Sequence, residues 1–263
     1  GSGTQMERDY DYCSARHFSD LEPASDIGQR AGERAIRRLN PRKARSQQVP
    51  VVFDPRLSGG FPRILAGLIS GAAISRGTSI LKDKMNERVF ATNIEIIDDP
   101  LRERGLSSRP FDGEGVRGES RKIVKDGVLT TWLLDTRSAR QLKLRSTGHA
   151  SRGTSSPPSP GPTNLYMSPG ATSRDDLIGN IDNGFYVSEM MGMSFNNITG
   201  DYSRGASGFW INNGELVHPV NEMTVAGNIK DMFLELTPAD DLTFRYGINA
   251  PTLRIDGMTV AGV

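Results

Sequence analysis

The sequence predicts an α+β fold with a largely antiparallel β-sheet, several hairpins and a few packed helices. Strand-like runs are joined by short turns such as Asp126-Gly127 and Asn212-Asn213-Gly214, which are typical of hairpins. Such hairpins dominate over strand–helix–strand units, which favours antiparallel pairing. The 263 residues are enough to bury a sizeable core, as one large domain or two small ones. The chain shows no internal repeat.

The first third of the chain predicts one helix and one buried strand. Residues 25–39 read as a helix that Ser25 or Asp26 caps and that Pro41 ends. One face of this helix is apolar: Ile27, Ala31, Ala35 and Leu39. Residues 49–54, VPVVFD, predict a short buried strand because β-branched side chains dominate them.

The middle of the chain contains the clearest hairpin, residues 115–134. Its arms are residues 116–124 and 128–134. A strand is predicted over residues 92–100 and a short helix over 136–144. The Pro/Ser/Gly tract of residues 152–164 predicts no regular structure, and a loop of this length is either functional or mobile.

The last hundred residues are again rich in predicted strands. A strand is expected at 184–190, a second hairpin from 205–211 and 215–220, and a final strand at 251–262. Residues 225–236 predict a helix, because four apolar side chains fall on one side of it: Ile229, Met232, Phe233 and Leu236.

Charge and cysteine content exclude several classes of protein. Lys and Arg number 32 against 31 Asp and Glu, so bulk charge predicts no polyanionic partner. The basic cluster around residues 37–45 has two interpretations, a nucleic-acid contact or a solvated helix end, and the electrostatics of a helix C-terminus favour the second. A single cysteine, Cys13, excludes an internal disulfide framework. Without a signal-peptide pattern or an apolar run of about 20 residues, we expect a soluble, cytoplasmic protein without membrane contact.

The residues that usually perform catalysis are sparse. His17, His149 and His218 are the only histidines, and their spacing matches no metal-binding motif, although distant histidines can still meet in space. Neither a P-loop nor a GxSxG turn occurs. Asp98-Asp99 before Pro100 is typical of a turn. Asp112 and Glu114 flank a glycine and are interpreted as a solvated turn rather than an acid–base pair.

Several stretches together resemble the TldD/PmbA family, also called modulators of DNA gyrase, and specifically its PmbA (TldE) branch. The most specific stretch is residues 200–232, within which GDYSRGASGFWINNGE and PVNEMTVAGNIKDM match the family. The resemblance covers nearly the whole chain beyond the first few residues. The other matching stretches are MERDYDYCSARHFSDLE, NPRK, RGTS (76–79), FDGEGVR, KDGVLTTWLLDTRSAR, STGHA and TNLYM.

In the TldD branch, the segment before the RGTS run carries a His-Glu-x-x-x-His motif that binds zinc and supplies a general base. Counting back from Gly77 places those positions at about Pro62, Arg63 and Gly67. A guanidinium group does not give up its proton, and the other two side chains contain no ligand atom. The cysteine ligand that the TldD branch offers before its last strand is also missing from RYGINAPTLRID. The resemblance therefore implies no zinc, no other cofactor and no catalytic residue here. The small residues of the segment 61–79 then serve packing, by letting a helix approach its neighbours closely.

The resemblance implies a non-catalytic subunit that pairs with a TldD-like zinc metallopeptidase and helps to enclose unfolded peptides. An unfolded substrate can add to a free sheet edge as an extra strand. The alternative is a regulator of DNA gyrase or of a toxin–antitoxin system that acts through protein–protein contacts, without direct nucleic-acid binding. Independent peptidase activity through another metal arrangement ranks last. We expect a dimer of the isolated chain and a heterodimer in the cell. Residues 1–48 are expected to be a helical lead-in from a missing N-terminal domain, and 49–263 the C-terminal domain.

The candidate peptide-groove or interface residues are Asp201, Tyr202, Arg204, Trp210 and His149. Residues 200–205, GDYSRG, predict an exposed tight turn because two glycines bracket them. There Arg204 would anchor a carboxylate or a peptide carbonyl, Asp201 would orient Arg204, and Tyr202 would lie against an extended backbone. The alternative is that Asp201 and Arg204 pair only to hold the turn. Trp210 is either an interface residue or ordinary hairpin core.

Overall fold

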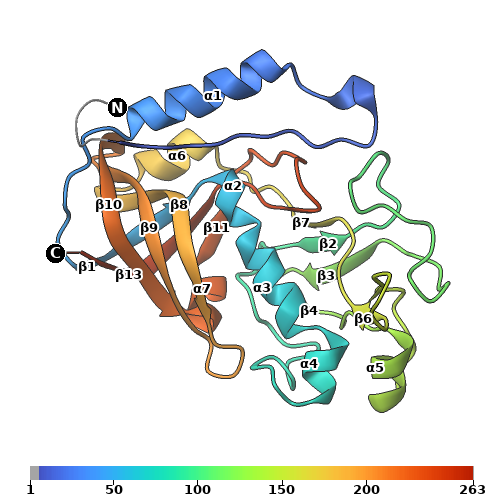
Figure 1. The fold of residues 1–263 in the computed structure, drawn as a ribbon. Coiled ribbons are helices and arrows are strands. Elements are labelled where there is room, and N and C mark those ends of the chain that lie inside the picture. The colour runs from blue at the N-terminus through green and yellow to red at the C-terminus, as the bar shows by residue number, and fades with distance from the viewer. Residues whose placement is uncertain (1–5, 263) are drawn as a thin grey trace.

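The computed structural model describes residues 6–262 (Figure 1). Its main feature is a closed ring of five long strands. In this ring β1 pairs with β8 in parallel, and all the other neighbours are antiparallel. The ring closes because β13 pairs with both β10 and β1. A short strand, β11, pairs with residues 253–255 of β13, before the part of β13 that pairs with β10. The strands are β1 (Gln47–Phe53), β8 (Asn183–Phe195), β9 (Asp201–Asn212), β10 (Glu215–Asn228), β13 (Leu253–Ala261) and β11 (Leu236–Pro238).

A second, smaller sheet stands beside the ring. Its order is β12-β7-β2-β3-β4, and only the β12–β7 pair is parallel. The strands are β2 (Ile96–Asp98), β3 (Arg121–Lys125), β4 (Val128–Leu129), β7 (Leu165–Met167) and β12 (Ile248–Asn249). Strands β5 (Ala150–Ser151) and β6 (Ser159–Pro160) pair with each other as an antiparallel ribbon. The predicted α+β fold with largely antiparallel strands is therefore confirmed.

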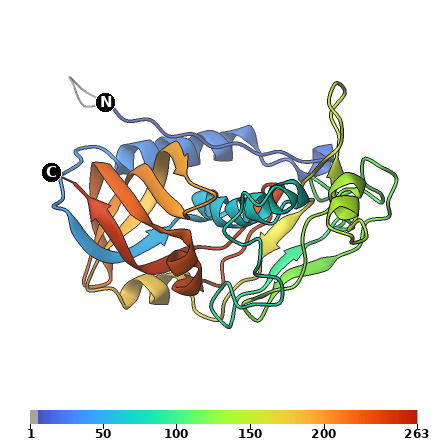
Figure 2. The ribbon, with the colours of Figure 1, turned by 90° about the horizontal axis from the view of Figure 1, so that it is seen from below.

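Three consecutive helices lie between the ring and the small sheet (Figure 2). They are α2 (Pro55–Ser58), α3 (Gly60–Leu68) and α4 (Gly71–Ser75). The ring of Phe61, on α3, meets Phe53 of β1 edge-on, with 4.9 Å between centroids, and lies 6.2 Å from Tyr202 of β9. Each buried aromatic side chain of this kind contributes roughly 2–3 kcal/mol. These contacts hold α3 firmly against the strands.

The remaining helices lie at the periphery. Helix α1 (Ala24–Arg37) runs along the outside of the molecule, with an extended N-terminal segment beside it (Figure 1). The predicted apolar face of α1 is half-buried, but its N-cap is Pro23, and neither Ser25 nor Asp26 caps it. The others are η1 (Phe18–Asp20), α5 (Thr136–Gln141), α6 (Arg174–Gly179) and α7 (Ile229–Leu234).

Both predicted hairpin turns are present. Asp126 and Gly127 have φ values of 51° and 78°, and Asn213 and Gly214 have 48° and 79°. Two successive residues with positive φ define the turn that suits the twist of a two-residue hairpin. The arms of the first hairpin are only β3 and β4, shorter than predicted, whereas β9 and β10 are longer.

Three predictions from local sequence are wrong. Residues 225–228 continue β10, so the predicted helix 225–236 shrinks to α7, and β11 follows it. Residues 201–205 form the start of β9, not a tight turn, because β8 and β10 pair with them on both sides. The tract 152–164 contains one short paired stretch, β6. In the first two cases pairing with strands farther along the chain overrides the local preference.

Small residues of the segment 61–79 serve packing at some positions but not at others. A Cβ atom added to Gly71 would lie 2.4 Å from Ser138 Oγ and 2.7 Å from Leu134 Cδ2. Helix α4 therefore approaches α5 closely only because Gly71 has no side chain. A Cβ added to Gly67 would meet nothing within 4 Å. Gly67 faces open space.

This contrast predicts opposite effects of two alanine substitutions. Gly71→Ala should lower the free energy of unfolding by about 1–3 kcal/mol, because the added methyl group overpacks the contact with Ser138. Gly67→Ala should leave stability unchanged or raise it by up to about 1 kcal/mol through helix propensity. Urea unfolding followed by circular dichroism measures both, and equal effects of the two variants would contradict this packing account.

Candidate functional site

Strand β8 has a free edge over its second half. Strand β1 pairs only with Phe185, Tyr186 and Val187 of β8, whereas β9 continues alongside as far as Phe195. Within the described residues no strand covers the other side of β8 from residue 188 onward. A strand edge of this kind presents backbone N–H and C=O groups on which another chain can pair.

A cleft runs along this free edge. It consists of three adjoining hollows of about 430, 610 and 250 Å³. Leu57 of α2 and Met190 of β8 line all three, which makes the cleft continuous. We refer to the three parts as the ionic end, the tyrosine section and the apolar groove.

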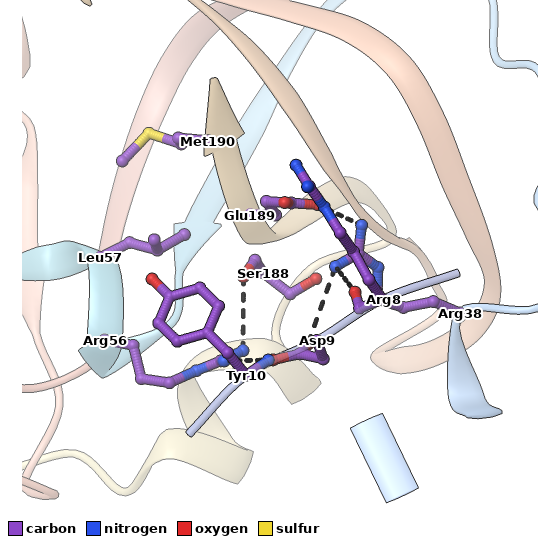
Figure 3. Close-up of a pocket in the computed structure, with 9 residues that line it drawn as sticks. All are labelled: Arg8, Asp9, Tyr10, Arg38, Arg56, Leu57, Ser188, Glu189 and Met190. Carbon is purple, nitrogen blue, oxygen red and sulfur yellow. Dashed lines mark hydrogen bonds and ion pairs between the residues drawn. The ribbon is translucent and has the colours of Figure 1, made fainter. Parts of the chain in front are cut away.

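The ionic end lies between the N-terminal segment, α2 and the middle of β8 (Figure 3). Arg56 contacts Asp9 at 2.9 Å and donates to the carbonyl of Ser188 at 3.3 Å. Arg38 pairs with Glu189 and lies 3.7 Å from Asp9. Figure 3 places Leu57, Met190 and Tyr10 on the side of this hollow away from Arg38. The charges at this end are therefore largely neutralised by one another.

The tyrosine section is lined by aromatic rings from two distant segments. Tyr10 and Tyr12 stack with 6.4 Å between ring centroids, and Tyr12 lies 5.5 Å from Tyr246. All three rings line the cleft, and Tyr10 and Tyr12 are 66% and 46% exposed. Tyrosine side chains are typical of binding sites, because each offers apolar and polar contacts and loses little conformational entropy when it binds.

The apolar groove lies between α3 and the β8–β9 hairpin. Its walls include Phe61 and Ile64 of α3 and Phe195 of β8, and Gly67 leaves the helix side open. The Tyr202 hydroxyl donates to the Met190 sulfur at 3.3 Å. Burial raises the pKa of Tyr202, and the nearby Arg204 guanidinium only partly opposes this rise. The hydroxyl therefore stays protonated at neutral pH.

The N-terminal segment that forms one wall of the cleft is held by a buried carboxylate. The Asp11 side chain is 1% exposed and contacts Arg30, Arg34 and Arg245. Burial of Asp11 opposes ionisation, but the hydrogen bonds from Arg30 and the Tyr12 amide outweigh it. The two further arginines add to this effect, so the pKa of Asp11 lies below its ordinary value.

A carboxylate with a lowered pKa stabilises the folded chain above the unfolded-state pKa near 4, and the contribution is lost as the pH falls through the folded-state value. Asp11→Asn should therefore lower the free energy of unfolding by about 2 kcal/mol at pH 7. The difference in the free energy of unfolding between the variant and the unmodified chain should become smaller as the pH falls toward 3. Urea titrations at both pH values test this, with the exposed Asp26→Asn as control. A difference that does not change with pH would contradict the assignment to Asp11.

The apolar groove does not suit a zinc ion. Pro62, Arg63 and Gly67, the positions expected to correspond to the zinc motif of the TldD branch, all lie on α3. Pro62 is buried, and Arg63 and Gly67 line the groove. None of the described residues that line the groove is a histidine, cysteine, aspartate or glutamate, the side chains that bind zinc. Over residues 6–262 no three such side chains form a metal-binding group.

Tyr202 and Arg204 are the two candidate site residues that the structure brings to the groove. The predicted contact between Asp201 and Arg204 is wrong, because residues three apart on a strand point to opposite faces. Asp201 instead accepts from Thr199 Oγ1 at 2.6 Å, and Arg204 Nε donates to the carbonyl of Gly192 at 2.9 Å. Trp210 is 8% exposed and packs in the core against Phe185.

His149 lies in a buried polar cluster outside the cleft. Its Nε2 is 3.1 Å from Asp98 Oδ2, and its Nδ1 is 2.8 Å from Thr147 Oγ1. Asp98 also accepts from the amide and the hydroxyl of Thr163, at 2.7 and 2.5 Å. The interpretation of Asp98 as a simple turn residue is therefore wrong, because its side chain is fully buried.

Asp112 is likewise not a solvated turn residue. It is 4% exposed and accepts from three backbone amides, those of Glu114, Val116 and Ala150. Sequence reasoning missed both carboxylates, because each accepts at least one hydrogen bond from a residue far along the chain: Ala150 for Asp112, and His149 and Thr163 for Asp98.

Comparison with known families gives a match over most of the chain. The PmbA/TldA metallopeptidase C-terminal domain matches residues 46–262. Over 98% of its own length, this chain is 39% identical to a metalloprotease PmbA of Escherichia coli O157:H7. It is 37% identical to a metalloprotease PmbA homologue of Haemophilus influenzae, again over 98% of this chain. A TldD homologue of Buchnera aphidicola is 26% identical over 99% of the chain. The chain spans 55% of the length of each of the first two relatives.

Solved structures show the same fold. A crystal structure from Bacteroides thetaiotaomicron, described as a modulator of DNA gyrase, superposes with a TM-score of 0.90 at 31% identity, covering 100% of this chain and 58% of that one. TldE from Thermococcus kodakarensis gives a TM-score of 0.82 at 25% identity, covering 92% of this chain and 56% of that one. Among the described residues no helix is long and apolar enough to cross a bilayer.

Proposed function

This chain belongs to the PmbA/TldD metallopeptidase family, and on that basis we propose that it is a non-catalytic subunit that holds unfolded peptides for a TldD-like zinc metallopeptidase. The single observation that carries the proposal is the cleft along the free edge of β8. Over the part of the chain that the structure describes, it combines a strand edge that no other strand covers with apolar walls, and its groove is lined by none of the side chains that bind zinc.

The occupant that suits this cleft is an extended backbone. A peptide that adds to β8 gains main-chain hydrogen bonds that do not depend on its sequence, and its alternate side chains enter the groove. A folded protein has already satisfied its backbone groups within its own structure. The cleft therefore favours unfolded segments over folded domains.

The closed ring limits where an unfolded substrate can add as an extra strand. Closure removes edges from β9, β10 and β13 over their paired lengths. Within the ring, the expected strand addition is therefore proposed at residues 188–195 of β8.

The partner proposal rests on family relations. One solved relative is named TldE, and relatives named TldD match the same chain. We propose that the partner supplies zinc and the general base and that this chain supplies the peptide cleft, within a heterodimer in the cytoplasm. We further propose that residues 1–48 lead in from a preceding domain.

Reconstitution with a TldD-like metallopeptidase tests this function. The chain alone should not cleave an unfolded peptide, and the mixture should form a heteromer by light scattering and cleave faster than the partner alone. Cleavage by this chain alone, or a mixture that neither associates nor changes the rate, would overturn the proposal.

A regulatory role in DNA supercoiling is the second candidate, because two of the solved relatives are described as modulators of DNA gyrase. It would act through protein contacts. Two residues of the basic cluster form ion pairs within the chain. Arg38 is 8% exposed and pairs with acidic residues, and Lys43 pairs with Glu222. A change in gyrase supercoiling on addition of the chain, with no effect on peptide cleavage, would favour this candidate.

A further inference from the structure

The charges that line the apolar groove and the tyrosine section are all of one sign. The apolar groove contains two charged side chains, Arg63 and Arg204. The tyrosine section contains the same two together with Arg56 and Arg245, and no aspartate or glutamate is among the described residues that line either hollow. A cleft with one sign of charge and apolar walls concentrates ligands of the opposite charge.

Two of these four arginines are already neutralised. Arg56 pairs with Asp9 and Asp54, at 2.9 and 3.1 Å. Arg245 pairs with Asp11 and Glu22, at 3.4 and 3.2 Å. Their charges hold the N-terminal segment and are not available to a ligand without breaking these pairs.

Arg63 and Arg204 are different. Neither forms an ion pair with any residue from 6 to 262. Arg63 is exposed on α3, one turn before Gly67. Arg204 is half-buried on β9, and its Nε–H is fixed by the carbonyl of Gly192 at 2.9 Å. The two guanidinium groups line the same hollows from opposite elements, a helix and a strand.

We propose that Arg63 and Arg204 together bind a carboxylate of the peptide that occupies the cleft, so that the chain prefers acidic peptide segments or free C-termini. This inference rests on the proposed peptide-binding function and specifies its ligand. Guanidinium groups match carboxylate geometry and form hydrogen bonds about twice as strong as neutral ones.

The test uses three labelled, otherwise uncharged, unfolded peptides of one sequence and length. The first has an amidated C-terminus, the second has a free C-terminal carboxylate, and the third is amidated with one central glutamate. Fluorescence anisotropy should show that the second peptide, the third, or both bind about tenfold more tightly than the first. The preference should weaken as salt is added. Tighter binding of the second peptide would identify the C-terminal carboxylate as the bound group, and tighter binding of the third would identify the glutamate side chain.

Variants assign the preference to the two side chains. Arg63→Gln and Arg204→Gln should each remove most of it, so that each variant binds the anionic peptides and the amidated neutral peptide with similar affinity. The matched control is Arg137→Gln, since Arg137 is exposed on α5, outside the cleft. Circular dichroism confirms folding, and Arg63→Gln is the decisive variant because its side chain has no partner within the described chain.

Two outcomes would overturn the inference. One is equal affinity of the unmodified chain for all three peptides, and the other is a preference that survives in both variants. In either case binding of the neutral peptide would leave the proposed function standing. Failure of all three peptides to bind would contradict the proposed function itself.

Discussion

Replacing Asp98 by alanine is expected to lower the free energy of unfolding by about 3–5 kcal/mol. The side chain is fully buried at the end of β2 and faces three donors: the Thr163 amide, the Thr163 hydroxyl and His149 Nε2. Without the carboxylate these groups stay buried with no acceptor, and each such loss is strongly destabilising. The cluster ties the small sheet to the segment around residues 147–150.

Urea unfolding of the purified variants measures this effect. Asp98→Asn retains an acceptor oxygen and should lose less stability than Asp98→Ala, so it gives a measurable value even where the alanine variant does not fold. Asp83→Ala is the control, because that carboxylate is 84% exposed and should change stability by less than about 0.5 kcal/mol. A loss as small for Asp98→Ala as for Asp83→Ala would show that the buried cluster does not stabilise the fold.

Replacing Gly67 by tryptophan is expected to reduce peptide affinity at least tenfold without unfolding the chain. Gly67 lines the apolar groove, and a Cβ placed there meets nothing within 4 Å. An indole ring at this position enters a hollow of about 250 Å³ and occupies the space that peptide side chains would need. The helix itself tolerates the substitution, because tryptophan has a better helix propensity than glycine.

Anisotropy titration with the neutral amidated peptide measures the affinity. Gly67→Ala is the matched control, since a single methyl group leaves most of the groove open, and it should bind as the unmodified chain does. Addition of the tryptophan variant to a TldD-like partner should also give slower peptide cleavage than addition of the alanine variant. Unchanged affinity in Gly67→Trp would place the peptide site elsewhere on the molecule.

Elements whose cause is local were predictable from the sequence. The Asp-Gly and Asn-Gly turns are examples, because positive φ values at two successive residues leave few alternatives to a hairpin. The strand at 49–54 is another, because its β-branched residues suit a buried strand. The lack of zinc ligands at Pro62, Arg63 and Gly67 also depends only on the side chains present.

Features that depend on distant pairing were not predictable. GDYSRG resembles a turn locally, yet Gly205 lies opposite Met191 on one side and Thr224 on the other, within the closed ring. The four residues before α7 belong to β10 for the same reason. A strand in the middle of a sheet is specified by its neighbours as much as by its own residues.

The cleft could not be predicted from the sequence. It combines residues from the N-terminal segment, α2, α3, β8, β9 and the loop before β12, which lie up to more than 200 positions apart in the chain. The sequence indicated Tyr202 and Arg204 through family resemblance, but no local pattern indicated Arg63 as a second free guanidinium group. Tryptophan is a common residue type at binding sites, but Trp210 lies in the core. Its indole N–H donates to Asn183 Oδ1 within the sheet at 3.0 Å.

The most direct test of the central claim, that this chain holds an unfolded peptide without a metal of its own, is peptide binding by the isolated chain. A labelled unfolded peptide should be titrated with the chain, without a partner, once in buffer and once in excess EDTA. The account predicts saturable binding with the same dissociation constant in both titrations and no cleavage of the peptide. No binding, or binding that EDTA abolishes and zinc restores, would contradict it.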